Sequence, residues 1–315
     1  MMKTRTLGTT GMEISSIVFG GNVFGWTLDS PQSFAMLDAC HDNGITTIDT
    51  ADVYSRWKPG NHGGESETQI GNWLASNPGK REKMQIFTKV GMDMGEGKTG
   101  LSPHWIRQAV EESLSRLKTD YIDLYFSHRF DPDTPHEDTL GTYKDLIDEG
   151  KIRAIGASNF TEGQLEDALN IARAQDLPAY QVMQPEYSLV SRATFEGPLQ
   201  RFCIDNGLGV VTYFSLASGF LSGKYRSKSD VANHARGGMV EKYLDTGGIE
   251  VLNVLEEVAS NKSATMAEVA IAWLLHREGV TAPIASATKA QHLESLVKAA
   301  SISLTPEEVE TLAVF

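Results

Sequence analysis

The segment IVFGGNVFGW, residues 17–26, decides between the two folds that the rest of this sequence permits. Its first four residues, Ile17–Gly20, form an apolar run that is typical of a buried parallel strand. A doubly wound sheet that binds a dinucleotide carries a G-x-G-x-x-G turn directly after its first strand. The residues after Gly20 lack that spacing, so the sequence favours the alternative, a closed (β/α)8 barrel.

Outward from this segment, short apolar or β-branched runs alternate with helical patterns along the chain. Such alternation predicts parallel pairing, in a barrel or in an open doubly wound sheet. The expected strands are Ile17–Gly20, Thr46–Asp49, Gln85–Lys89, Asp123–Ser127, Ile152–Ala157, Tyr180–Met183, Gly209–Tyr213 and Pro283–Ala285. The predicted fold class is therefore α/β, a (β/α)8 TIM barrel.

Local signals mark the ends of these elements. A capping hydroxyl or an early proline predicts helix starts at Pro31, Ser102, Thr161 and Thr305. The stretch KTRTLGTTGMEIS has two strand-like pieces around a Gly-Thr turn, which predicts an N-terminal β-hairpin. No shift in composition divides the chain, so we expect a single domain over residues 1–315.

Two long loops are expected on the carboxyl face of the barrel, at Gly91–Leu101 and Leu216–Gly248. The first contains a literal G-x-G-x-x-G at Gly95–Gly100. These glycines lie beyond the strand end, and the next helix starts only near Ser102, so a phosphate-binding turn is disfavoured. We expect a flexible loop there, able to fold over a ligand.

The charge and cysteine content limit the partners and the cellular compartments that we expect for this protein. The 28 Lys and Arg against 41 Asp and Glu give a net charge of −13, which disfavours nucleic acid and anionic membranes as partners. No apolar stretch reaches the length of a membrane span, and the N-terminus lacks the apolar core of a signal peptide, so we expect a cytoplasmic protein. Cys40 and Cys203 read as buried, reduced thiols. No metal site is expected, and the oligomeric state is left open.

Four side chains with acid–base chemistry lie at or just after successive strand ends: Asp49, Tyr54, Lys89 and His128. The carboxyl ends of barrel strands meet on one face, so these groups are expected to share a pocket. An ammonium beside a phenol lowers the phenol's pKa from its usual value near 10. Such a phenol can protonate a carbonyl oxygen as hydride reaches the carbon. Taken singly, each residue has an ordinary alternative, such as a turn cap for Asp49 or a solvent-facing position for Lys89.

The same residues carry a resemblance to the aldo-keto reductase family. ITTIDTADVYS (45–55), IFTKVG (86–91), DLYFSHRFDPDTPHEDTL (123–140), GKIRAIGASNF (150–160) and YFSLASGFLSGKY (213–225) all resemble motifs of that family. The resemblance runs over essentially the whole chain. It implies an oxidoreductase that uses NAD(P)H to reduce aldehydes or ketones to alcohols, or runs the reverse reaction.

The resemblance also implies roles for individual residues. Tyr54 would be the general acid, Lys89 and Asp49 would tune its pKa, and His128 would orient the carbonyl. The implied cofactor contacts are Gly21, Asn22 and Asp49 near the first strands, Ser158, Asn159 and Gln184 at the carboxamide, Tyr213 stacked on the nicotinamide, Phe214, Ser215, Leu216, Gly219 and Lys224 along the pyrophosphate, and Ser286, Thr288, Lys289 and His292 at the adenosine end.

Two departures from the family pattern bear on the cofactor. Phe214-Ser215 stands where many relatives have Ser-Pro. The adenosine segment has Thr288-Lys289 and then Ser295-Leu296, where many relatives have an arginine and a later Glu-Asn pair. NADP(H) is expected because Lys289 can pair with a 2′-phosphate, and NAD(H) stays possible.

Two other functions compete with carbonyl reduction. One is a cofactor-binding redox sensor without significant turnover, because relatives of the fold serve as ion-channel auxiliary subunits. The other is an aldolase or isomerase with a Schiff base on Lys89, which requires a neutral amine, whereas Asp49 favours a charged one. The expected substrate is a small carbonyl compound or its alcohol; Trp26 and Trp57 either line an apolar slot for it or serve only in packing. Arg129 either recognises an anionic substrate or makes an ordinary surface contact.

Overall fold

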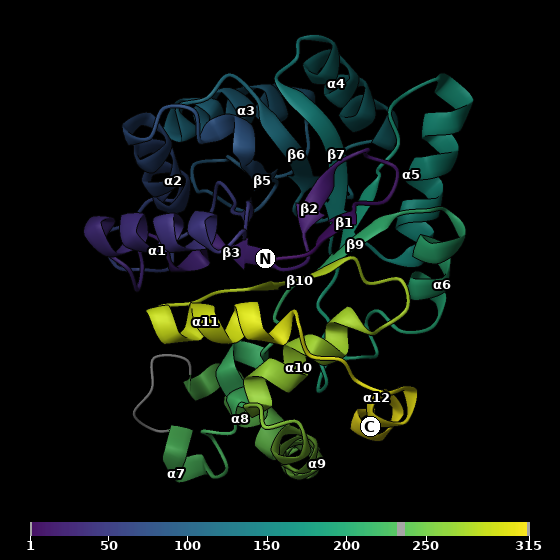
Figure 1. Ribbon diagram of the computed structural model, residues 1–315. Helices are drawn as coiled ribbons and strands as arrows, with labels where there is room; N and C mark the ends of the chain where they lie inside the picture. Colours follow the sequence, from purple (N-terminus) through teal and green to yellow (C-terminus); the bar gives the residue numbers. More distant parts are fainter. Residues whose placement is uncertain (1, 232–236, 314–315) are drawn as a thin grey trace.

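The computed structural model describes residues 2–231 and 237–313, and within them parallel strands close into a barrel in the order β10-β3-β4-β5-β6-β7-β8-β9 (Figure 1). The strands are β3 (Val18–Gly20), β4 (Thr47–Asp49), β5 (Gln85–Val90), β6 (Ile122–Ser127), β7 (Ile152–Ser158), β8 (Val182–Gln184), β9 (Gly209–Thr212) and β10 (Ala282–Ala285). The predicted (β/α)8 barrel is confirmed, and every expected strand lies within two residues of its predicted bounds.

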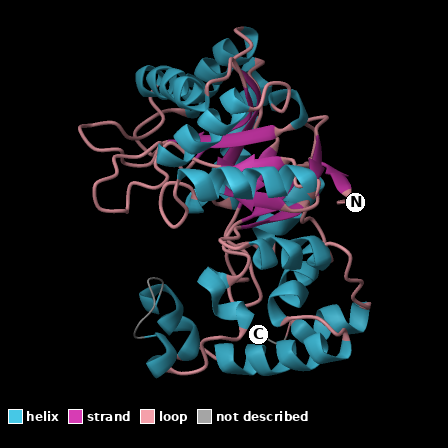
Figure 2. Cartoon of the chain, turned by 60° about the vertical axis from the view of Figure 1, so that its left-hand side comes forward, coloured by secondary structure: helices cyan, strands magenta, loops and turns pink. Residues whose placement is uncertain are grey.

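Helices surround the strands on the outside, as Figure 2 shows in cyan around magenta. They are α1 (Ser30–Asp42), α2 (Glu65–Ser76), α3 (Pro103–Leu117), α4 (His136–Asp148), α5 (Glu162–Gln175), α6 (Pro198–Asp205), α9 (Gly248–Asn261), α10 (Met266–Leu275), α11 (Ala290–Ala299) and α12 (Pro306–Leu312). The hydroxyls of Ser102, Thr161 and Thr305 cap α3, α5 and α12, as predicted, by accepting a backbone N–H three residues on. None of these helices is both long and apolar enough to cross a bilayer within the part of the chain that the structure describes.

The N-terminal hairpin closes the amino end of the barrel. Its strands β1 (Thr4–Thr6) and β2 (Glu13–Ser15) pair antiparallel, as the sequence predicts. Leu7 and Ile14 are fully buried and join the apolar cluster inside the barrel, which includes Phe87 and Phe126. The hairpin therefore covers the amino end of the barrel.

One segment differs from the expectation of a long loop. Residues 216–248 contain a 3-10 helix, η3 (Ala217–Ser222), and two short helices, α7 (Lys228–Val231) and α8 (Gly237–Leu244). The helices form because apolar side chains within the polar segment reach a core: Val240 and Tyr243 are buried, and Tyr243 packs on Phe220 with ring centroids 5.3 Å apart. The glycine-containing stretch at residues 91–101 is a loop, as predicted.

Candidate active site

The carboxyl ends of β4, β5 and β6 bring the four acid–base side chains together. Lys89 Nζ donates to Asp49 Oδ2 at 2.6 Å and to the Thr50 carbonyl at 2.7 Å, and it lies 3.4 Å from the Tyr54 hydroxyl. The rings of Tyr54 and His128 meet edge-on with centroids 6.1 Å apart. The four groups therefore share one pocket, as the strand-end argument expects.

Backbone hydrogen bonds hold the loop after β4 against β5. Thr50 N donates to the Phe87 carbonyl at 2.8 Å, and Asp52 N donates to the Lys89 carbonyl at 3.2 Å. Farther along, the Ser55 hydroxyl donates to the Phe24 carbonyl at 2.9 Å. Tyr54 lies between these anchors, so its phenol is held over the Lys89 ammonium.

The pKa of the Tyr54 phenol differs from the expectation that Lys89 lowers it. Burial, together with the carboxylates of Asp49 and Asp52, raises the pKa of the Tyr54 phenol well above its usual value rather than lowering it. Burial likewise lowers the pKa of Lys89, although Asp49 opposes that shift. The expected tuning by Lys89 is outweighed because the phenol lies in a desolvated pocket, where the phenolate is costly. Tyr54 is thus a protonated donor at neutral pH.

His128 is neutral in this environment. Burial and the neighbouring positive charge of Lys89 lower the pKa of its imidazole well below the usual value. Its Nδ1 is buried and has no hydrogen-bond partner among the described residues. A neutral imidazole has one nitrogen that donates and one that accepts, so it can hydrogen-bond a carbonyl or hydroxyl oxygen.

A hydrogen-bonded chain links the next group of predicted residues to the same pocket. Gln184 Nε2 donates to Asp49 Oδ1 at 2.9 Å, and the Ser158 hydroxyl donates to the Gln184 carbonyl at 2.9 Å. Asn159 Nδ2 donates to the His128 carbonyl at 2.9 Å, while Asn159 Oδ1 accepts from the Tyr213 hydroxyl at 2.6 Å. The structure therefore gathers the amide side chains expected at a carboxamide around the acid–base set.

Two residues that follow the first and last strands of the barrel, Asn22 and Ser286, are also joined by a hydrogen bond. The Ser286 hydroxyl donates to Asn22 Oδ1 at 2.6 Å and to the Gly20 carbonyl at 2.8 Å. A Cβ added to Gly21 would lie 3.0 Å from the Asp49 carbonyl oxygen, so only glycine fits there without displacing its neighbours. Ser286, Asn22 and Gly21 thus line the seam between β10 and β3, beside Asp49.

Positive side chains converge farther out, where β10 leads into α11. Lys289 precedes α11, and the pKa of His292 is lowered by burial and by the charges of Lys289 and Lys224. Within residues 2–231 and 237–313, neither lysine has an ion-pair partner. Thr288 lies directly before Lys289 and is half-buried. Two unneutralised ammonium groups beside a helix N-terminus form a site that suits a phosphate.

The residues after β9 that were predicted to contact the pyrophosphate differ in their exposure and in their hydrogen bonds. Phe214 is 42% exposed, whereas Ser215 is buried and its hydroxyl donates to the Thr212 carbonyl. The Ser215 hydroxyl is therefore committed to the backbone. Gly219 has a positive φ of 92°, and an added Cβ would lie 3.5 Å from Lys224 Nζ, so this turn approaches Lys224 closely.

A buried polar cluster behind the site was missed in the sequence. Glu67 accepts from Arg116 Nε at 2.7 Å and from the Thr88 hydroxyl at 2.6 Å. Asp52 is 1% exposed, and neither carboxyl oxygen has a hydrogen-bond partner in the described chain. Burial and the charge of Glu67 raise the pKa of Asp52 well above its usual value. One residue in the sequence could have indicated this cluster. Asp52 is an acidic residue two positions before Tyr54, in a motif whose other side chains pack inward.

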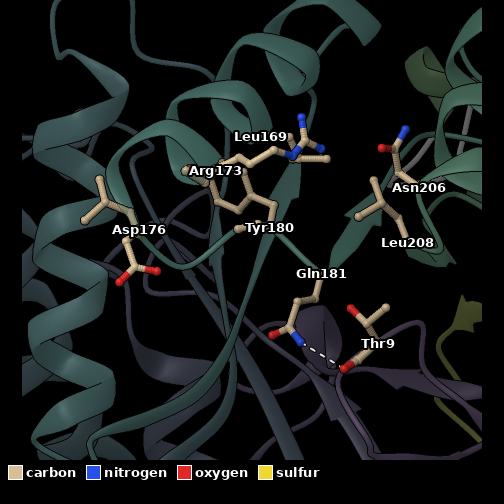
Figure 3. A pocket seen from close by; sticks show the side chains of 11 residues that line it. Thr9, Leu169, Arg173, Asp176, Tyr180, Gln181, Asn206 and Leu208 are labelled. Atoms are coloured by element: carbon tan, nitrogen blue, oxygen red, sulfur yellow. Dashed lines mark hydrogen bonds between the residues drawn. The ribbon is translucent and has the colours of Figure 1, made fainter.

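Two further findings concern possible ligand sites elsewhere in the described chain. The hollow in Figure 3, of about 400 Å³, lies at the amino ends of β8 and β9, where Gln181 Nε2 donates to the Thr9 carbonyl. It faces the hairpin, at the end of the barrel where barrel enzymes do not place their catalytic groups. The described residues contain no cluster of three or more His, Cys, Asp or Glu side chains suited to a metal.

Comparison with known proteins shows the family to which the chain belongs. The profile of the Aldo/keto reductase family matches residues 16–314. The chain belongs to the aldo/keto reductase family. It is 33% identical to an aldo-keto reductase of Fusarium vanettenii (96% of this chain, 88% of that one) and 34% identical to an uncharacterized oxidoreductase of Bacillus subtilis (99% and 95%). It is also 32% identical to a probable voltage-gated potassium channel subunit beta of Oryza sativa (99% and 95%). As an aldo/keto reductase, the protein has an oxidoreductase role.

Proposed function

We propose that this aldo/keto reductase uses NADPH to reduce aldehydes or ketones to alcohols, with Tyr54 as the general acid. The observation that carries the proposal is the contact of Lys89 Nζ with both Asp49, at 2.6 Å, and the Tyr54 hydroxyl, at 3.4 Å, in a pocket that also contains His128. The Tyr54 hydroxyl can give up a proton, and the Lys89 ammonium beside it can stabilise the anion that remains.

When bound, the nicotinamide cofactor would supply hydride to the carbonyl carbon. The Tyr54 hydroxyl gives its proton to the carbonyl oxygen as negative charge develops there. The Lys89 ammonium, held by Asp49 and Thr50, then lies beside the phenolate and limits its cost. Neutral His128 donates a hydrogen bond to the same carbonyl oxygen and fixes its position against Tyr54.

The residues present fit a phosphorylated dinucleotide. Ser158, Asn159 and Gln184 would hold the carboxamide, and Tyr213 would lie against the nicotinamide ring. Lys224 and Lys289 would receive phosphate, because their positive charges converge without a carboxylate to neutralise them in the described chain, and His292, whose pKa is lowered, would add a neutral hydrogen-bonding group. The 2′-phosphate is present in NADPH and absent from NADH. The Lys289 ammonium is a compact point charge that suits this phosphate, which favours NADPH over NADH.

Replacing Lys289 with alanine should weaken NADPH more than NADH. Losing one phosphate contact is expected to raise the Kd for NADPH about tenfold and to leave the Kd for NADH within twofold, measured by quenching of intrinsic fluorescence. Lys298→Ala, at the far end of α11, removes the same charge and serves as the control. Equal losses for both cofactors in the Lys289 variant would show that the 2′-phosphate is held elsewhere.

A second candidate is a cofactor-binding sensor without significant turnover, which the relative named as a potassium channel subunit beta supports. The two functions separate in one experiment: titration with NADPH and NADH, then a panel of aldehydes and ketones at saturating cofactor. We expect loss of absorbance at 340 nm matched by alcohol formation. Binding without any NADPH loss across the panel would favour the sensor, and failure to bind either cofactor would refute both.

The environment of Lys89 argues against Schiff-base chemistry. Its side chain is fully buried, and its three N–H groups face Asp49, the Thr50 carbonyl and the Tyr54 hydroxyl. A nucleophilic amine would have to leave all three partners and lose a proton before it could attack a carbonyl. Lys89 is therefore better suited to stabilising charge than to forming a covalent bond.

A further inference from the structure

Arg129 is an arginine at the mouth of the site whose charge nothing in the described chain neutralises. It follows His128 directly, at the end of β6, and its side chain is exposed. Among residues 2–231 and 237–313 it makes no hydrogen bond, ion pair or ring contact. Two arginines toward the amino ends of the strands behave differently: Arg153, near the start of β7, pairs with Asp123 at 3.0 Å, and Arg81, before β5, pairs with the same carboxylate at 2.8 Å.

The position of Arg129 relative to the reacting groups follows from its neighbours. The His128 carbonyl accepts from Asn159, and Asn159 accepts from Tyr213, so these three residues form one continuous side of the pocket. The charge of Arg129 affects the pKa values of two of these residues, His128 and Tyr213. It adds to the effects of burial and Lys89 on the pKa of His128, and it opposes the rise of the Tyr213 pKa, which burial brings to about 12. The guanidinium is thus close enough to this side of the pocket for its charge to act on His128 and Tyr213.

The surroundings of Tyr54 are apolar where Trp57 and Trp26 pack. Trp57 packs edge-on against Tyr54 and against Trp26, with both ring centroids 5.6 Å away. Its indole is nevertheless 47% exposed, which is unusual for so large an apolar side chain and leaves a face open beside the Tyr54 phenol. A substrate whose carbonyl reaches Tyr54 and His128 therefore has an aromatic face beside Tyr54 and an unpaired guanidinium on the residue that follows His128.

We propose that Arg129 binds a carboxylate on the substrate, so that this enzyme selects aldehydes or ketones that carry a carboxylate on an apolar or aromatic body. The proposal rests on the carbonyl reduction proposed above. A guanidinium presents N–H donors in a planar fork that matches a carboxylate in a bidentate manner. In a protein with a net charge of −13, such a cation also supplies local attraction for an anion that the rest of the surface repels.

The test compares two substrates that differ only in this group: 4-carboxybenzaldehyde and its methyl ester, methyl 4-formylbenzoate. For the wild-type enzyme with NADPH, kcat/KM should be higher for the acid than for the ester. Arg129→Gln should lower kcat/KM for the acid by about 10- to 100-fold, mainly through KM, which is the range for charge-assisted hydrogen bonds. The ester should change by less than about threefold. Arg129→Lys should keep part of the preference, because it retains the charge without the fork.

Arg201→Gln, on α6, removes the same charge from another exposed position and should leave both substrates unchanged. The wild-type preference for the acid should also weaken as ionic strength rises, whereas turnover of the ester should not. An acid-to-ester ratio that is the same in wild type and Arg129→Gln would overturn the proposal while leaving carbonyl reduction intact. Failure of the wild type to reduce either substrate, or any other carbonyl compound, would instead refute the proposed function.

Discussion

Replacing Tyr54 with phenylalanine should lower kcat for carbonyl reduction by about 10²–10⁴-fold, the range that a positioned general acid contributes. The substitution removes one oxygen atom and keeps the ring that packs on Trp57 and His128. Because the hydroxyl's only hydrogen-bond partner among the described residues is Lys89, at 3.4 Å, its loss leaves no tightly bonded group there without a partner. The fold and the cofactor affinity should therefore be preserved, which binding of NADPH checks by fluorescence.

The control is Tyr121→Phe, which removes a phenolic hydroxyl at the amino end of β6, where the ring stacks between Arg81 and Arg153. It should leave turnover unchanged. The pH dependence offers a second readout. Because the pKa of Tyr54 lies well above its usual value, the acid should stay protonated and kcat should show no fall from loss of this proton at or below pH 9. A Phe variant with wild-type turnover would exclude Tyr54 as the acid.

Much of this site follows from the sequence because barrel geometry makes strand ends converge. Asp49, Lys89 and His128 are separated by about 40 residues each, yet parallel strands with right-handed crossovers place their carboxyl ends on one face. Alternating apolar runs were sufficient to find those ends. Tyr54 could be placed only approximately from sequence, because its position depends on the backbone hydrogen bonds of Thr50 and Asp52 to β5.

What the sequence could not give is the degree of burial. The direction of the Tyr54 pKa depends on whether desolvation or the Lys89 charge dominates, and that balance depends on how deeply the phenol lies. The same limit hid Asp52 and Glu67, which look like surface acids in a list of residues but lie behind the site. The helices within residues 216–248 were missed because their apolar positions are few and are spaced among glycines and charges.

Lys89→Met should both silence the reaction and destabilise the protein. Lys89 and Asp49 are 0% and 2% exposed, so the variant leaves a buried carboxylate with Gln184 as its remaining side-chain donor. Breaking such a pair typically costs about 3–5 kcal/mol in the free energy of unfolding. The pKa of Asp49, already raised by burial, should rise further without the ammonium, so the folded variant binds a proton that the unfolded chain releases above about pH 4. The stability deficit relative to wild type should therefore be largest near pH 8 and shrink as the pH falls toward 5, as denaturant titrations at several pH values would show.

The double variant Asp49→Asn/Lys89→Met separates the two consequences of that loss. An asparagine carbonyl oxygen at position 49 can still accept from Gln184 Nε2, and no charge is left buried, so most of the lost stability should return. Activity should not return, because no cation remains to stabilise the Tyr54 phenolate. A double variant as unstable as Lys89→Met would mean that packing of the lysine stem, and not the unpaired carboxylate, causes the loss. A double variant with restored turnover would mean that the Lys89 charge has no part in the proton transfer, since stability and chemistry would then recover together.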